Sequence, residues 1–191
     1  MLDPLSLKYV NNTYNIKTFF GCKQFKIGEI IDFNKENAVY VQEIDFSKDS
    51  FSSSVKGFWQ WEKYFRHSRV ESIVFLNNSA NFSYIQVNFQ AHQGLKNTIL
   101  KAFILPPNSS IGYLYNIPFK LGDNNIFLKI PPSSKGLITF YLFHTGELRK
   151  IPPDERLLGI TVRKIKLTDV TEKNSPTLTE YTIIIIDNRS K

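Results

Sequence analysis

The chain of 191 residues has little cysteine and histidine, and both shortages exclude kinds of site. Its one cysteine, Cys22, has no partner within the chain for a disulfide, and a cysteine-based metal centre is excluded for the same reason. Three histidines, at positions 67, 92 and 144, are too few to suggest a histidine-rich metal centre. We therefore expect no metal and no cofactor.

Long hydrophobic runs and familiar catalytic motifs are also missing. The longest aliphatic run covers only residues 183–186, far below the about 18 apolar residues that span a bilayer. The N-terminus lacks a basic region followed by an apolar core, so no secretory signal is expected. There is no Gly-x-Ser-x-Gly elbow, no His-Glu-x-x-His zinc motif, no phosphate-binding glycine loop and no dinucleotide fingerprint. These absences favour a protein that is not an enzyme.

The charge balance is basic. The chain has 24 Lys and Arg against 17 Asp and Glu, a formal charge of +7. Such an excess favours anionic partners, including nucleic acid, an acidic membrane surface or acidic glycans, but many soluble proteins carry as much for solubility alone. We weigh solubility ahead of a polyanion site.

The segments between turn-forming residues are short and rich in Ile, Val, Phe, Tyr and Thr, which predicts many strands. The cleanest alternation covers residues 82–91, where Ile85 and Val87 lie on one face and Gln86 and Asn88 on the other. The remaining predicted strands are residues 25–33, 38–44, 71–76, 98–105, 110–118, 125–130, 136–143, 159–167 and 181–186. The one helical candidate is a short turn around residues 59–65, within a long loop predicted at 45–67.

About ten strands with Gly, Pro and Asn turns predict an all-β fold, an antiparallel jelly-roll-like β-sandwich. Residues 1–24 are expected to form an irregular lead-in and residues 25–170 the sandwich domain. Residues 171–191 are expected to form a C-terminal extension with one strand. That strand pairs back into the sheet or with a partner chain.

Three segments carry a family resemblance: residues 25–40, with Phe25-Lys-Ile-Gly28 and Ile31-Asp-Phe33; residues 57–67, with Gly57-Phe-Trp-Gln-Trp-Glu62; and residues 130–167. In the last segment Asp154, Arg156, Leu158, Gly159, Ile160, Val162, Ile165 and Leu167 follow an Asp-x-Arg-x-Leu-Gly pattern position by position. Their order resembles the β-sandwich accessory domain associated with bacterial glycosyltransferases and phosphoglycerol-transferase-like envelope proteins.

The resemblance implies a non-catalytic carbohydrate-recognition or scaffolding module for cell-envelope polysaccharide biosynthesis. Its partners would be a glycan, anionic if the charge excess has a role, and a separate glycosyltransferase or other envelope-assembly protein. It would work in the cytoplasm or at the inner membrane surface. Two alternatives stay open: a sugar-active enzyme with paired carboxylates, and a structural module that pairs through an open edge at residues 181–186. Nucleic-acid binding ranks last.

Sugar sites combine flat aromatic rings with polar side chains that bind hydroxyls. On this basis the candidate ligand-binding residues are Trp59, Trp61, Tyr64, Arg66, His67, Tyr113, Tyr115 and Arg149. One of the two tryptophans is expected in the core. Alternation places Tyr113 and Tyr115 on one face, which is either core or a ligand platform.

The Asp154-x-Arg156-x-x-Gly159 motif is expected to have a structural role. Asp154 follows two prolines and suits a turn in which its carboxylate accepts nearby backbone N–H groups, and Arg156 can pair with it. Gly159 permits a close backbone approach at the start of a strand. His144 is expected to be a strand-end histidine rather than a catalytic base.

Overall fold

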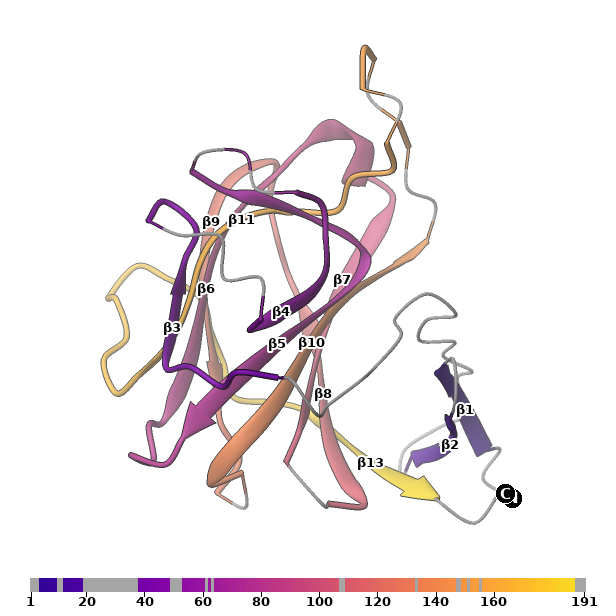
Figure 1. Cartoon of the computed structure of the whole chain (residues 1–191), viewed down its shortest axis with the longest axis vertical. Helices are drawn as coiled ribbons and strands as arrows, with labels where there is room; N and C mark the ends of the chain where they lie inside the picture. The colour runs from indigo at the N-terminus through magenta and orange to yellow at the C-terminus, as the bar shows by residue number, and fades with distance from the viewer. Residues whose placement is uncertain are drawn as a thin grey trace.

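The computed structural model describes residues 4–9, 12–18, 38–48, 53–60, 62, 64–106, 109–132, 134–146, 149–150, 152–154 and 156–187 (Figure 1). The strands are β1 (Pro4–Tyr9), β2 (Asn12–Thr18), β3 (Glu43–Asp45), β4 (Val55–Phe58), β5 (Arg66–Asn78), β6 (Tyr84–Ala91), β7 (Thr98–Leu105), β8 (Ile111–Ile117), β9 (Gly122–Lys129), β10 (Gly136–Gly146), β11 (Thr161–Thr168), β12 (Thr177–Leu178) and β13 (Thr182–Asp187). One short 3-10 turn, η2 (Gln93–Leu95), precedes β7. The predicted all-β class is confirmed.

The strands form one curled sheet, so the predicted two-sheet sandwich is wrong. The sheet has 13 strands in the order β1-β2-β13-β8-β7-β10-β5-β11-β6-β9-β12, with β3 added to β11 and β4 added to β5. Neighbouring strands are antiparallel except β12, which runs parallel to β9. The predicted antiparallel character is therefore confirmed for most of the sheet.

Strand β5 is the reason that the sheet does not divide into two. At its beginning, Arg66 and His67 pair with β11, while residues 71–78 pair with β10. One strand of 13 residues thus belongs to both halves of the fold. Backbone hydrogen bonding therefore continues from β10 through β5 to β11, and the two halves of the sheet have no free edges at this place.

The main core fills the concave side of the curled sheet. Val87 and Phe89 of β6 and Ile165 of β11 pack in one cluster with Val74 of β5 and Phe140 of β10. These side chains come from both halves of the sheet, which Figure 1 shows on either side of the interior. The alternation predicted for residues 82–91 is confirmed.

The outer face of the β5-β10-β7 part is apolar as well. Phe75, Phe103 and Tyr141 belong to a second buried cluster on that side, with Tyr40 packed against it. Strand β10 pairs with β5 and with β7, so the near-continuous apolar run at 136–143 is a central strand, as predicted.

The C-terminal residues close the curl. Strand β12 pairs with β9 at one end of the sheet, and β13 pairs with β8 and β2 towards the other. Residues 177–182, here called the C-terminal strap, therefore span the gap between β8 and β9 (Figure 1). Strand β13 pairs with β8 at residues 182–185 and with β2 at residues 184–187, so the strand predicted at 181–186 pairs back into the sheet, one of its two predicted outcomes.

Other predictions are corrected at the level of single elements. The lead-in predicted as irregular contains strands β1 and β2, and the loop predicted at 45–67 contains β4. The described part of residues 59–65 contains no helix. The strand predicted at 25–33 lies outside the described residues.

Gly57 and Gly136 offer a matched test of backbone packing, since their φ angles are +71° and +82°. A Cβ on Gly57 would lie 2.2 Å from the Glu71 carbonyl oxygen, whereas one on Gly136 would meet nothing within 4 Å. We expect Gly57→Ala to lower the free energy of unfolding by about 3 kcal/mol or more, and Gly136→Ala by about 1 kcal/mol. Urea denaturation of both variants checks this, and equal losses would contradict it.

Candidate functional site

The structure disperses the predicted site residues. Trp59, Arg66 and His67 lie together at the junction of β4 and β5, where the Trp59 N–H donates to the His67 carbonyl at 2.9 Å. Tyr64 lies in the connecting loop with an exposed fraction of 57%. Arg149 is exposed beyond β10, and its backbone N–H donates to the Gly94 carbonyl. Trp61 lies outside the described residues, and Tyr113 and Tyr115 are on β8.

A cluster around Arg156 joins the two polar motifs found in the sequence. Arg156 Nη2 lies 2.6 Å from Asp154 Oδ2 and 2.9 Å from Glu62 Oε1. The guanidinium is also 5.5 Å from the centre of the Trp59 ring, and that of Arg69 is 4.5 Å from it. The Trp59 indole Nε1 donates to the carbonyl of Leu157 at 3.3 Å. Segments 94 residues apart are thereby fixed to one another.

The charged groups of this cluster are paired with one another. Hydrogen bonds from the Arg156 side chain and backbone lower the pKa of Asp154 to about 2. Asp154 and Glu62 in turn raise the pKa of Arg156 above its ordinary value. The Asp154 carboxylate accepts the Arg156 backbone N–H at 2.9 Å, as predicted for a turn. The predicted turn at Asp154 and its pairing with Arg156 are both confirmed.

Gly159 lies against β5 at close range. Its N–H donates to the Ser68 carbonyl at 2.7 Å, and a Cβ at this position would lie 2.1 Å from Ser68 Oγ. His92 Nε2 lies 2.9 Å from the Gly159 carbonyl oxygen, so it donates there when it carries the proton. The predicted close backbone approach at Gly159 is confirmed.

The other side chains around Trp59 also contact groups within the protein. Trp59 is half-buried with two guanidinium groups near its ring. His67 lies 3.0 Å from Thr161 Oγ1, and burial lowers its pKa. The Arg66 guanidinium is 5.7 Å from the centre of the Phe46 ring. Most polar groups that a ligand would need here are thus already used inside the protein.

Tyr113 and Tyr115 do share a face, and that face is the core. Their exposed fractions are 7% and 0%, and both rings contact Tyr181. The Tyr115 hydroxyl donates to the Lys129 carbonyl, and burial raises the pKa of that hydroxyl. Neither ring is open to solvent, so of the two alternatives the core position holds for both.

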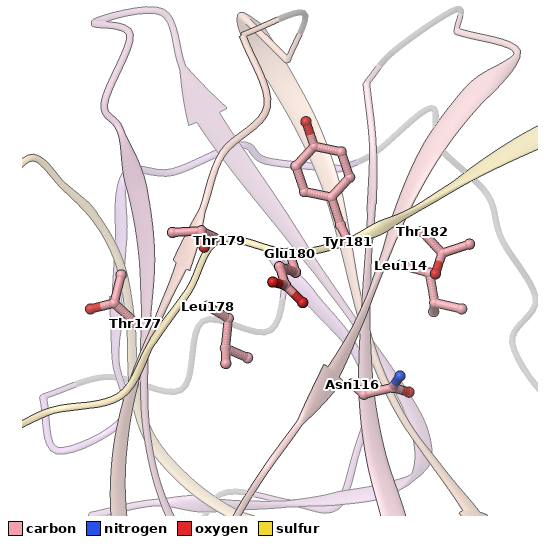
Figure 2. A pocket seen from close by; sticks show the side chains of 8 residues that line it. All are labelled: Leu114, Asn116, Thr177, Leu178, Thr179, Glu180, Tyr181 and Thr182. Carbon is pink, nitrogen blue, oxygen red and sulfur yellow. The ribbon is translucent and has the colours of Figure 1, made fainter. Parts of the chain in front are cut away.

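A different site lies between β8 and the C-terminal strap. It is a pocket of about 480 Å³, shown in Figure 2. Its lining consists of Leu114, Asn116, Thr177, Leu178, Thr179, Glu180, Tyr181 and Thr182. Among the described residues, no hydrogen bond or ion pair engages the side chains of Asn116, Thr179 or Glu180.

The course of the strap explains why the pocket forms. The strap leaves β9 after Leu178 and first pairs with β8 at Thr182, opposite Leu114, so residues 179–181 lie between the two strands without pairing to either. The Tyr181 ring anchors the divergent part, lying 5.1 Å from the ring of Tyr113 and 5.5 Å from that of Tyr115. The polar Thr179 and Glu180 remain exposed beside this anchor. The pocket is the space beside this divergent part, and its lining combines the apolar Leu114 and Leu178 with exposed polar side chains.

A second pocket, beside β9 and residues 174–176, is less suited to a ligand. It also measures about 480 Å³ and includes Asn124 and Asn125. The Asn124 amide nitrogen donates hydrogen bonds to the carbonyls of Lys120 and Gly122. The Asn125 amide donates to Glu172 at 2.7 Å and accepts from Gln86 at 2.7 Å. These amides brace the turn and the C-terminal segment.

The lining of the pocket at the strap includes one carboxylate, Glu180, whereas most glycoside hydrolases use two. Within the described ranges, no group of three His, Cys, Asp or Glu side chains is placed to hold a metal ion. In the same residues no helix is long and apolar enough to cross a membrane.

Sequence reasoning missed this pocket because its walls are about 60 residues apart in the chain. The only local sign was the threonine-rich run at 177–182, which precedes the predicted strand at 181–186. No family model, curated protein or solved structure matches the chain. The resemblance to glycosyltransferase accessory domains therefore stays a prediction that rests on the quoted residues.

Arg156 allows a direct test of the cluster. We expect Arg156→Ala to lower the free energy of unfolding by about 1–3 kcal/mol, because Asp154 and Glu62 both lose the hydrogen bonds from the guanidinium, although Asp154 keeps the one from the backbone N–H of residue 156. Arg163→Ala removes an exposed pair with Asp123 and should cost less than about 1 kcal/mol. Thermal and urea unfolding measure both. Equal effects would contradict the structural role of Arg156.

His144 lies buried within β10 and does not face an open site. Its exposed fraction is 6%, Nδ1 lies 3.4 Å from Thr98 Oγ1, and burial lowers its pKa to about 4. No hydrogen-bond partner for its Nε2 is found among the described atoms. The ring is therefore neutral in the folded protein at neutral pH, and its buried position agrees with the structural role predicted for it.

The lowered pKa of His144 predicts that the free energy of unfolding decreases in mild acid. The His144 ring binds a proton near pH 6.5 in the unfolded chain but only near pH 4 in the folded protein. The contribution of this group to the free energy of unfolding is therefore fully present above pH 6.5 and is lost as the pH falls from 6.5 to 4. We expect a loss of about 2 kcal/mol between pH 7.5 and pH 5 from this group. Denaturation of wild type and His144→Leu at both pH values measures it. An unchanged pH dependence in the variant would contradict the assignment.

Proposed function

We propose that this chain is a non-catalytic carbohydrate-recognition module whose pocket between β8 and the C-terminal strap holds a sugar unit. The observation that carries the proposal is the set of uncommitted polar side chains there, which includes the Asn116 amide, the Thr179 hydroxyl and the Glu180 carboxylate. Sugar hydroxyls donate and accept hydrogen bonds, so they need this mixture of groups. By contrast, Trp59 and Arg156 are occupied within their cluster.

The pocket has a size that suits such a ligand. Its volume of about 480 Å³ lies within the range of roughly 300–1,000 Å³ found for small-molecule sites. Leu114 and Leu178 supply apolar surface for the carbon faces of a sugar ring. Because Tyr181 is anchored on two core tyrosines, little ordering of the strap is needed on binding, which favours affinity.

The resemblance of residues 152–167 supports the wider part of the proposal. By analogy with glycosyltransferase-associated accessory domains, the module serves cell-envelope polysaccharide biosynthesis beside a separate glycosyltransferase. It would then present a glycan chain to that partner in the cytoplasm, at the inner membrane surface. The one-carboxylate pocket favours this role over a sugar-active enzyme.

A glycan-array screen of the purified protein tests the binding site. Asn116→Ala removes an uncommitted amide from the pocket, and Asn88→Ala removes a matched one from the outer face of β6. We expect Asn116→Ala to weaken binding by about 5–30-fold, the effect of losing one or two hydrogen bonds, with Asn88→Ala unchanged. A folded wild-type protein that binds no glycan, or equal effects of the two variants, would contradict the proposal.

A further inference from the structure

The charge of the pocket is opposite to that of the chain. The sequence carries +7 overall, yet the eight lining residues include no Lys or Arg, and Glu180 is their only charged side chain. Lys101 of β7 pairs in register opposite Asn116, but it is buried and is not part of this lining. An anionic glycan, which the net charge suggested, would bring its negative group close to this carboxylate.

The position of Glu180 allows direct contact with a ligand. Figure 2 shows its side chain projecting from the middle of the strap into the space between Leu178 and Asn116. Within the part of the chain that the structure describes, no cation pairs with it. A carboxylate has two oxygens that accept hydrogen bonds, and its strongest partners are cationic donors.

Asn116 gives the carboxylate a complementary neighbour. It is exposed on β8, and its amide supplies both donors and an acceptor. A sugar ring between Glu180 and Asn116 could therefore place an ammonium group on the carboxylate and a hydroxyl on the amide. Neither contact requires any group of the Trp59 cluster.

We propose that the pocket selects sugars that carry a free, protonated amine, such as a de-N-acetylated hexosamine unit, over N-acetylated, neutral and acidic sugars. This inference rests on the proposed function and specifies its ligand class. The ammonium group donates charge-assisted hydrogen bonds to Glu180, which an N-acetyl or hydroxyl group cannot match. A uronic acid would meet like-charge repulsion at the same place.

Oligosaccharides of matched length test the effect of ligand charge on affinity apart from the effect of ligand size. The probes are a glucosamine oligomer, the N-acetylglucosamine oligomer of equal length, a neutral glucose oligomer and an oligogalacturonate. Each is titrated at pH 6 by calorimetry into wild type, Glu180→Gln and Glu43→Gln. Glu43 is an exposed carboxylate on β3 outside the pocket, so its variant controls for loss of one negative charge.

We expect the glucosamine oligomer to bind wild type about 3–10-fold more tightly than its N-acetylated counterpart. That preference should disappear in Glu180→Gln and persist in Glu43→Gln. Equal binding of the two oligomers, a preference unchanged in Glu180→Gln, or tighter binding of oligogalacturonate would overturn the inference while leaving carbohydrate recognition in place. Binding of none of the four probes by folded protein would count against the proposed function itself.

Discussion

The contact of Tyr181 with Tyr113 and Tyr115 holds the C-terminal strap across the open side of the curled sheet. It places a residue of the last segment against the core side of β8 and so determines where that segment must cross. The strap then reaches β9 through two paired residues at 177–178. The curl is thus closed by a chain connection rather than by a continuous ladder, and the pocket is the space that this connection leaves.

The polar groups at the β4–β5 junction have hydrogen-bond or ionic partners within the protein, and among the described residues those of the pocket at the strap do not. At the β4–β5 junction, Arg156 is matched by Asp154 and Glu62, and Trp59 is fixed by a hydrogen bond and two guanidinium groups. Such groups stabilise the fold because each has its partner before any ligand arrives. At the strap, Asn116 and Glu180 have solvent instead. Binding sites need groups of the second kind, which is why the strap is the better candidate.

Local features were predictable from sequence, and long-range ones were not. Strands at 82–91, 98–105 and 136–143 follow from period and turn residues alone, and the turn at Asp154 follows from short-range hydrogen bonding. The single curled sheet depends on β5 changing partners along its length, which alternation cannot reveal. The partner of Arg156 at Glu62 and the opposition of Asn116 and Glu180 depend on register between distant segments.

We propose that ligand contacts gather at the strap and not at the tryptophan cluster. Backbone amide NMR during titration with neutral and amine-bearing oligosaccharides tests it directly, because each amide reports on its own surroundings. We expect shifts concentrated at Leu114–Asn116 and Thr179–Thr182, with the amides of residues 57–69 and 154–159 unchanged. Shifts concentrated at residues 57–69 and 154–159 instead would contradict it.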